Sequence, residues 1–133
     1  MDRLDLSGSL RAEAIALNAD RLAFNISGSG KIQIRKLEAD ELAIQVSGSG
    51  DTDVAGQVRS QKISISGSGD HQASNLESDQ ATVEISGSGH ASLWVKESLT
   101  ASISGSGDVD YAGTPKVNSH TSGSGRIHPR ARP

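Results

Sequence analysis

The sequence predicts an all-β protein that folds as a right-handed parallel β-helix, a β-solenoid with about 20 residues per coil. The first observation is that the tetrapeptide Ser-Gly-Ser-Gly occurs six times, with successive copies starting 18 to 20 residues apart. Regular repeats of this length are typical of stacked coils. The second observation is that apolar and polar residues alternate between the copies, as in strands with one buried face. Right-handed winding is expected because parallel crossover connections strongly prefer that hand.

Residues 31–50 show the pattern of a single coil. The expected inward residues follow one another in steps of two, apart from two steps of three, where we expect the chain to turn a corner. These inward residues are Ile32, Ile34, Leu37, Ala39, Leu42, Ile44 and Val46. The third coil is one residue shorter, so the alignment of its middle stays ambiguous.

The alternation continues into the tetrapeptide, which we interpret as a corner of the coil. It places Gly48 and Gly50 inward and leaves Ser47 and Ser49 outward. Glycine allows a sharp bend and a positive φ, and we expect the serine hydroxyls to bond turn amides or the serine of the next coil. The predicted corner glycines are Gly28, Gly30, Gly48, Gly50, Gly67, Gly69, Gly87, Gly89, Gly105, Gly107, Gly123 and Gly125.

At the C-terminal end the repeat weakens. Residues 111–115 interrupt it, and Ser119 and Thr121 stand where branched residues stood before, as expected of a polar cap. We predict one solenoid domain over residues 1–127 and a basic, proline-containing tail over residues 128–133. The basic side chains in and just before this tail are Arg126, His128, Arg130 and Arg132.

At the N-terminal end the chain already has the pattern of a closing strand. Leu4 and Leu6 are expected to stack under Phe24 and Ile26. An open sheet edge is a template for further pairing. We therefore expect this edge to meet a second copy of the chain or further coils of a longer domain.

The composition excludes several classes of protein. Lys and Arg number 13 against 16 Asp and Glu, so the basic stripe of a nucleic-acid binder is not expected. Without cysteine the chain has neither a disulfide framework nor a thiolate metal site. No apolar run approaches the roughly 18 residues of a membrane span. The chain also shows no signal peptide at its start.

Charged residues recur at two corners of the repeat. Asp51, Asp70 and Asp108 directly follow the tetrapeptide, while Lys31, His90 and Arg126 hold that place in other coils. Because cations interrupt the ladder, we expect the carboxylates to accept turn amides rather than bind calcium. A second partial set, read in the same way, consists of Asp20, Asp40 and Asp79.

The histidines do not predict a metal site. His71 and His90 are offset by one residue in neighbouring coils, so they should point to opposite sides of the wall. His120 and His128 fall in the degenerate end. Zinc needs three or four converging ligands, and we predict no metal and no cofactor.

Catalytic motifs are not evident either. The sequence contains no serine-hydrolase elbow and no phosphate-binding glycine loop. Asp51 with Asp53, or Asp108 with Asp110, could imitate the acidic face of a β-helix lyase when Lys31 lies nearby. Surface charge on a strand usually serves only solvation, so we predict that the protein is not an enzyme.

Trp94 is the candidate contact for a protein or glycan partner. If Leu93 holds the register of Ile34, then Trp94 points outward, where an aromatic ring can anchor a protein or a sugar. The alternative is that the indole covers a corner of the core. The pattern around Trp94 fits both interpretations.

Residues 103–127, ISGSGDVDYAGTPKVNSHTSGSGRI, resemble the bacterial head GIN domain family of autotransporter adhesins. The resemblance implies a right-handed β-helix similar to pectin-lyase-like folds, without a catalytic set. It also implies a role in adhesion and a location in the cell envelope or outside the cell. We therefore predict a non-enzymatic surface module that presents flat faces to a partner or to itself. The alternatives are a polysaccharide-lyase-like enzyme and a structural stack that assembles end to end.

Overall fold

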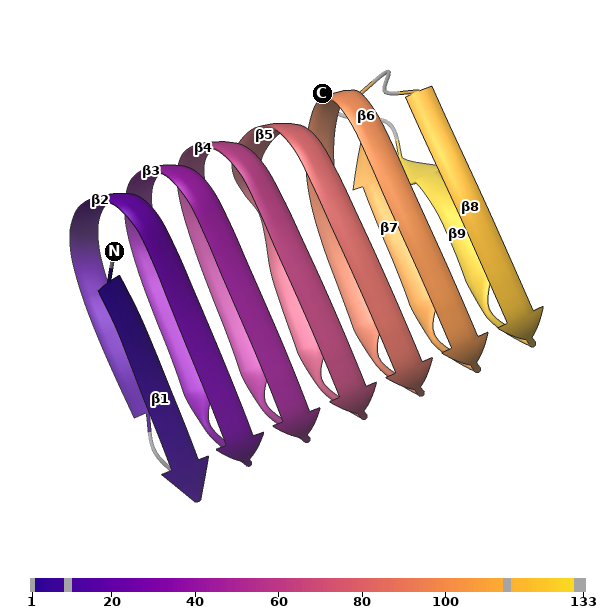
Figure 1. The fold of residues 1–133 in the computed structure, drawn as a ribbon, viewed down its shortest axis with the longest axis horizontal. Helices are drawn as coiled ribbons and strands as arrows, with labels where there is room; N and C mark the ends of the chain where they lie inside the picture. The colour runs from indigo at the N-terminus through magenta and orange to yellow at the C-terminus, as the bar shows by residue number, and fades with distance from the viewer. Residues whose placement is uncertain (1, 9–10, 114–115, 131–133) are drawn as a thin grey trace.

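The computed structural model describes residues 2–8, 11–113 and 116–130, and these form β-strands joined by tight turns. All strand pairings among these residues are parallel, and the strands stack into about six coils of roughly 19 residues (Figure 1). The predicted fold class is confirmed. The strands are β1 (Asp2–Gly8), β2 (Arg11–Gly28), β3 (Lys31–Gly48), β4 (Asp51–Gly67), β5 (Asp70–Gly87), β6 (His90–Gly105), β7 (Asp108–Ala112), β8 (Lys116–Gly123) and β9 (Arg126–Arg130).

The winding is right-handed. In Figure 1 each coil rises on the far side, crosses the upper edge and descends on the near side while the chain advances from β1 to β9. Each long strand therefore bends through a corner and contributes to both sides of the solenoid. The hydrogen-bonded order is β1-β2-β3-β4-β5-β6-β7-β9, and β8 pairs with β6.

The tetrapeptides lie in one column at the lower edge of the stack. Gly48 pairs in register with Gly28 on one side and Gly67 on the other. Its φ is +112°, and a Cβ atom on it would lie 2.7 Å from the carbonyl oxygen of Gly28. Both the left-handed conformation and the close approach of the backbones require glycine here. The predicted Gly-Ser-Gly corners are therefore part of the fold.

The two glycines of a corner differ in a way that the alternation does not predict. Gly50 is buried, and a Cβ atom on it would lie 2.5 Å from Cγ2 of Ile26. Gly48 is exposed, so the expectation that both glycines face inward is wrong. The positive φ of Gly48 breaks the alternation of the strand, and only the second glycine turns toward the core.

Hydrogen bonds at the corners run between backbone groups. The amide of Ser49 donates to the carbonyl oxygen of Gly28 at 3.0 Å, and that of Asp51 donates to Gly30 at 3.0 Å. The turn amides thus bond carbonyl oxygens of the preceding coil. The sequence analysis had expected serine hydroxyls in this role. The side chains of Ser47 and Ser49 are exposed.

The core is the interior of the stack, filled by the alternating inward residues. In β3 the predicted inward residues are buried except for Ala39, which is half-buried, and the exposed pairs 35–36 and 40–41 mark the two further corners. In the shorter coil, Gly56 lies opposite Leu37 with a φ of +138°, where a Cβ atom would collide with the Leu37 backbone. This glycine lets β4 turn with one residue fewer.

At the C-terminal end β6 pairs with both β7 and β8. Ser119 and Thr121 of β8 are exposed opposite Ala101 and Ile103, so this end presents polar side chains. Thr114 and Pro115 lie outside the described residues. β9 includes residues 128–130, which the sequence analysis assigns to the tail, and the boundary after residue 127 stays a prediction.

At the N-terminal end β1 pairs with β2 in the expected register, with Leu4 opposite Phe24 and Leu6 opposite Ile26. The side chains of Leu4 and Leu6 lie outside the described residues. Pairing of this edge with a second copy stays a prediction.

Candidate functional site

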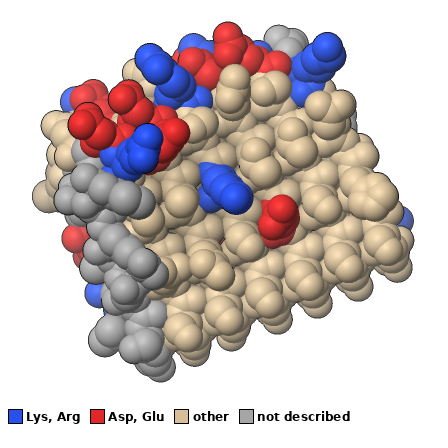
Figure 2. Space-filling model, viewed as in Figure 1, with Lys and Arg blue, Asp and Glu red and all other residues tan. Residues whose placement is uncertain are grey.

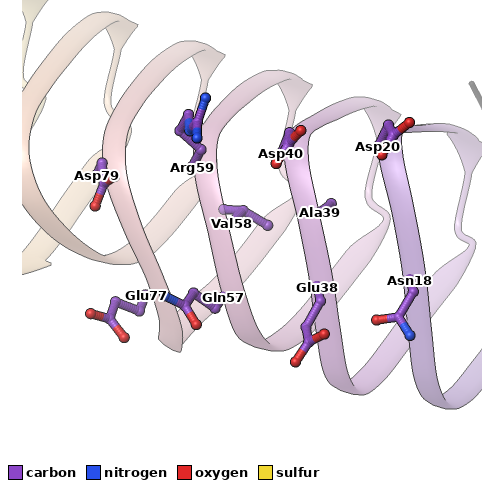
Figure 3. Close-up of a pocket in the computed structure, with 10 residues that line it drawn as sticks. All are labelled: Asn18, Asp20, Glu38, Ala39, Asp40, Gln57, Val58, Arg59, Glu77 and Asp79. Atoms are coloured by element: carbon purple, nitrogen blue, oxygen red, sulfur yellow. The ribbon is translucent and has the colours of Figure 1, made fainter.

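An acidic groove follows the upper corner of the coils (Figure 3). Its floor is formed by Ala39 and Val58. The predicted set Asp20, Asp40 and Asp79 lies in one row along the groove, with Arg59 between the last two. The residues that line the groove are Asn18, Asp20, Glu38, Ala39, Asp40, Gln57, Val58, Arg59, Glu77 and Asp79.

One end of this groove is neutralised by Lys96. Its Nζ lies 2.6 Å from Oε1 of Glu77 and 3.7 Å from Oδ1 of Asp79. The hydrogen bond with Glu77 is the main cause that raises the pKa of Lys96. Arg59 and Lys96 thus interrupt the carboxylates, and the groove is not a uniform carboxylate site.

A second set of charges lies on the ascending segments, which form the far side of the stack in Figure 1 and which we call the rear face. Asp51 pairs in register with Lys31 and Asp70, and His90 pairs with Asp70 and Asp108. The predicted interrupted column is thus present. Nε2 of His90 lies 3.4 Å from Oδ2 of Asp110. No group of three or more metal-binding side chains occurs within residues 2–8, 11–113 and 116–130.

Trp94 lies in β6 at the end of its ascending segment, where the pairing with β7 ends opposite Ala112. Leu93 and Val95 are buried, with exposures of 1 % and 0 %, so the indole is on the outer side of the wall. It remains partly exposed and borders Gly113, where a Cβ atom would lie 3.4 Å from Cδ1 of Trp94. The ring is therefore outward and only partly exposed, and its role as a partner contact stays a prediction.

A chain of buried polar groups crosses the core beneath Trp94, and the sequence analysis did not identify it. Oγ1 of Thr52 lies 2.6 Å from Nδ1 of His71, and Nε2 of His71 lies 3.4 Å from Oε1 of Gln61. Nε2 of Gln61 donates to Oγ of Ser78 at 2.8 Å, and this hydroxyl donates to the carbonyl oxygen of Trp94 at 2.9 Å. The chain thus joins β4, β5 and β6.

The partners of His71 define its neutral tautomer. Because Oε1 of Gln61 can only accept, Nε2 carries the proton and Nδ1 accepts from Thr52. Burial lowers the pKa of His71 to about 3, since a charged ring would lose its hydration. The prediction that His71 and His90 point to opposite sides is confirmed, because His71 has 0 % exposure and His90 is half-exposed.

The alternation of the strands contained the signal for this chain. Thr52 precedes Val54 by two residues and Gln61 precedes Ile63 by two, so both occupy inward positions. No helix among the described residues is long and apolar enough to cross a membrane.

Comparisons with known proteins identify the family. Residues 1–115 match the family described as "Putative auto-transporter adhesin, head GIN domain". A solved structure of a "putative adhesin" from Parabacteroides merdae has 24 % identity and a TM-score of 0.84, covering 97 % of this chain and 60 % of that one. A second, from Parabacteroides distasonis, has 25 % identity and a TM-score of 0.84, covering 98 % and 57 %.

A more distant "putative adhesin" from Bacteroides fragilis has 15 % identity and a TM-score of 0.79, covering 96 % of this chain and 91 % of that one. The chain spans about three-fifths of the length of the two Parabacteroides proteins. No significant match was found among curated proteins. The resemblance inferred from residues 103–127 is confirmed. The matched residues cover most of the sequence, and the chain belongs to the "Putative auto-transporter adhesin, head GIN domain" family.

Proposed function

We propose that this protein is a non-enzymatic adhesion module of the cell envelope or cell exterior, which binds a protein or glycan through the rear face around Trp94. The observation that carries the proposal is the partly exposed indole at the end of a rigid β-face, in a chain of an adhesin family. Aromatic rings that combine apolar area with a polar edge are frequent anchors of such contacts.

The position of Trp94 supports this role. Its carbonyl oxygen accepts a hydrogen bond from Ser78, and the neighbouring side chains Leu93 and Val95 are fixed in the core. The indole therefore projects from a backbone that is held on both sides. A partner that binds such a ring loses little conformational entropy on the protein side.

The lyase-like alternative has no comparable support. Asp51 and Asp53 are exposed on the rear face, where surface charge usually serves only solvation. The family and the similar solved structures are described as adhesins. The end-to-end stack likewise has no observation that favours it.

We predict that Trp94→Ala weakens partner binding by about 30-fold, the loss typical of an interface hot spot. The measurement is a glycan array and a panel of immobilised envelope proteins, followed by affinities for each ligand found. Trp94→Phe should retain part of the affinity because it keeps an aromatic ring.

The matched control is Ile15→Ala, which removes another apolar side chain, 78 % exposed. This variant should bind as the wild type does. Circular dichroism and a melting curve establish that each variant is folded. Unchanged affinity of folded Trp94→Ala for every ligand would overturn the proposed role of the rear face.

A further inference from the structure

The near side of the solenoid carries a surface that differs from the rest of the molecule. Figure 2 shows it as a flat, mostly uncharged area, while most charges gather along the upper edge. It is formed by outward side chains of the descending segments of β2 to β6 and is here named the neutral face. Its members are Ala23, Asn25, Ala43, Gln45, Lys62, Ser64, Thr82, Glu84, Thr100 and Ser102.

The neutral face has the shape that sheet packing requires. Its side chains are mostly short, and all of them stand on parallel strands in continuous register. Sheets pack face to face at about 10 Å when such side chains interdigitate. A long charged side chain on this face would prevent close packing unless it met the opposite charge.

Lys62 and Glu84 are placed so that a second copy can supply that opposite charge. Lys62 lies opposite Thr82 and Ser64 lies opposite Glu84, so Glu84 is one coil and two residues away from Lys62. Both side chains are exposed, and neither takes part in an ion pair within the described part of the chain.

We propose that two copies of this chain pair through their neutral faces around a two-fold axis, with Lys62 of each copy against Glu84 of the other. In a two-fold interface every contact occurs twice, so one lysine and one glutamate make a self-complementary pair of salt bridges. The axis lies in the plane between the two faces and passes midway between Lys62 and Glu84. These two residues stand at opposite corners of a rectangle whose other corners are Ser64 and Thr82. Ser64 and Thr82 lie close to the axis, so each comes near the same residue of the other copy.

The size of the face fits a weak dimer. Five coils of about 4.8 Å and strands of about eight residues give roughly 600 Å² on each copy. The total of about 1,200 Å² is at the lower limit of specific interfaces. We therefore expect a reversible dimer that forms at high protein concentration. The neutral face is separate from the proposed adhesion site, so this dimer goes beyond the proposed function.

Charge reversal tests the pairing. Sedimentation of the wild-type chain over a range of concentrations should show a monomer–dimer equilibrium. Lys62→Glu and Glu84→Lys should each raise the dissociation constant at least tenfold, because each places two like-charge pairs in the interface. The double variant Lys62→Glu/Glu84→Lys should restore dimerisation. Lys31→Glu, which reverses an exposed charge on the rear face, is the control and should dimerise normally.

A cross-linking experiment tests the position of the axis. The chain has no cysteine, so Thr82→Cys introduces a single thiol close to the axis. A short bis-maleimide should cross-link this variant into covalent dimers, whereas Gln72→Cys on the rear face should not be cross-linked. Circular dichroism establishes that the variants are folded.

Three results would overturn the pairing: a wild-type chain that stays monomeric at millimolar concentration, single reversals that dimerise normally, or a double variant that does not recover. If copies met through the N-terminal edge instead, the single charge reversals would dimerise normally and Thr82→Cys would not be cross-linked. The dimer should be unaffected by Trp94→Ala, and partner binding by Lys62→Glu. Failure of this inference is thereby distinguishable from failure of the proposed adhesion site.

Discussion

Acidification from pH 6.5 to pH 4.5 is expected to lower the free energy of unfolding by about 2 kcal/mol through His71 alone. In the folded chain, burial lowers the pKa of His71 to about 3, whereas in the unfolded chain it is about 6.5. Between these values the unfolded state binds a proton that the folded state does not. Stability therefore rises with pH across this window and is lost as the pH falls below about 6.5.

The surroundings of His71 explain why the cost is mainly one of charge. If Nδ1 were protonated, Thr52 could accept from it and turn its own hydroxyl toward the carbonyl oxygen of Asp70, which lies 3.4 Å away. The hydrogen bonds could thus adapt. The imidazolium would still be buried without a counter-ion among its hydrogen-bond partners, and that is unfavourable.

Urea denaturation at pH 7, 6, 5 and 4.5 measures this effect. The variant His71→Gln should be less stable than the wild type at pH 7 and should lack most of the pH dependence between pH 6.5 and 5. His90→Gln is the matched control, because His90 lies on the outer side of the same wall. It should keep the pH dependence. An unchanged slope in His71→Gln would show that other groups cause the acid sensitivity.

Gly67→Ala is expected to lower the free energy of unfolding by about 3 kcal/mol, combining a left-handed backbone with overpacking. The φ of Gly67 is +113°, and an added Cβ atom would lie 2.6 Å from the carbonyl oxygen of Gly48. The same carbonyl accepts the amide of Ser68 at 2.9 Å, so the backbone cannot retreat without losing that bond.

The control for this corner is Ser68→Ala, which removes an exposed hydroxyl from the neighbouring residue. It should change the stability by no more than about 0.5 kcal/mol. Urea denaturation of the two variants beside the wild type provides the comparison. If Gly67→Ala were as stable as Ser68→Ala, the corner would not depend on glycine.

The periodic part of this fold was predictable because one physical pattern repeats in every coil. The spacing of the tetrapeptides gives the coil length, and the alternation around Ile44 and Val46 gives the inward face. The outward position of the first glycine in each tetrapeptide, such as Gly48, was not predictable from alternation. Its positive φ depends on the backbone of the preceding coil, as the contact between Gly48 and Gly28 shows.

The candidate site was harder to predict because its geometry depends on contacts between coils. The alternation around Leu93 left two positions open for Trp94, and its place beside Gly113 depends on how β7 turns away. Thr52 and Gln61 were missed for a related reason. Alternation places both inward, but their hydrogen bonds depend on His71 and Ser78, which β5 supplies from the next coil.

The chain of polar groups beneath Trp94 has a consequence for how such proteins can change in length. Coils with purely apolar interiors are interchangeable, so duplication or loss of one leaves its neighbours with equivalent contacts. The two coils that contain Thr52, Gln61, His71 and Ser78 are an exception. The buried polar side chains of one coil find their hydrogen-bond partners in the other. Evolution can therefore lengthen or shorten this solenoid on either side of that block more easily than within it.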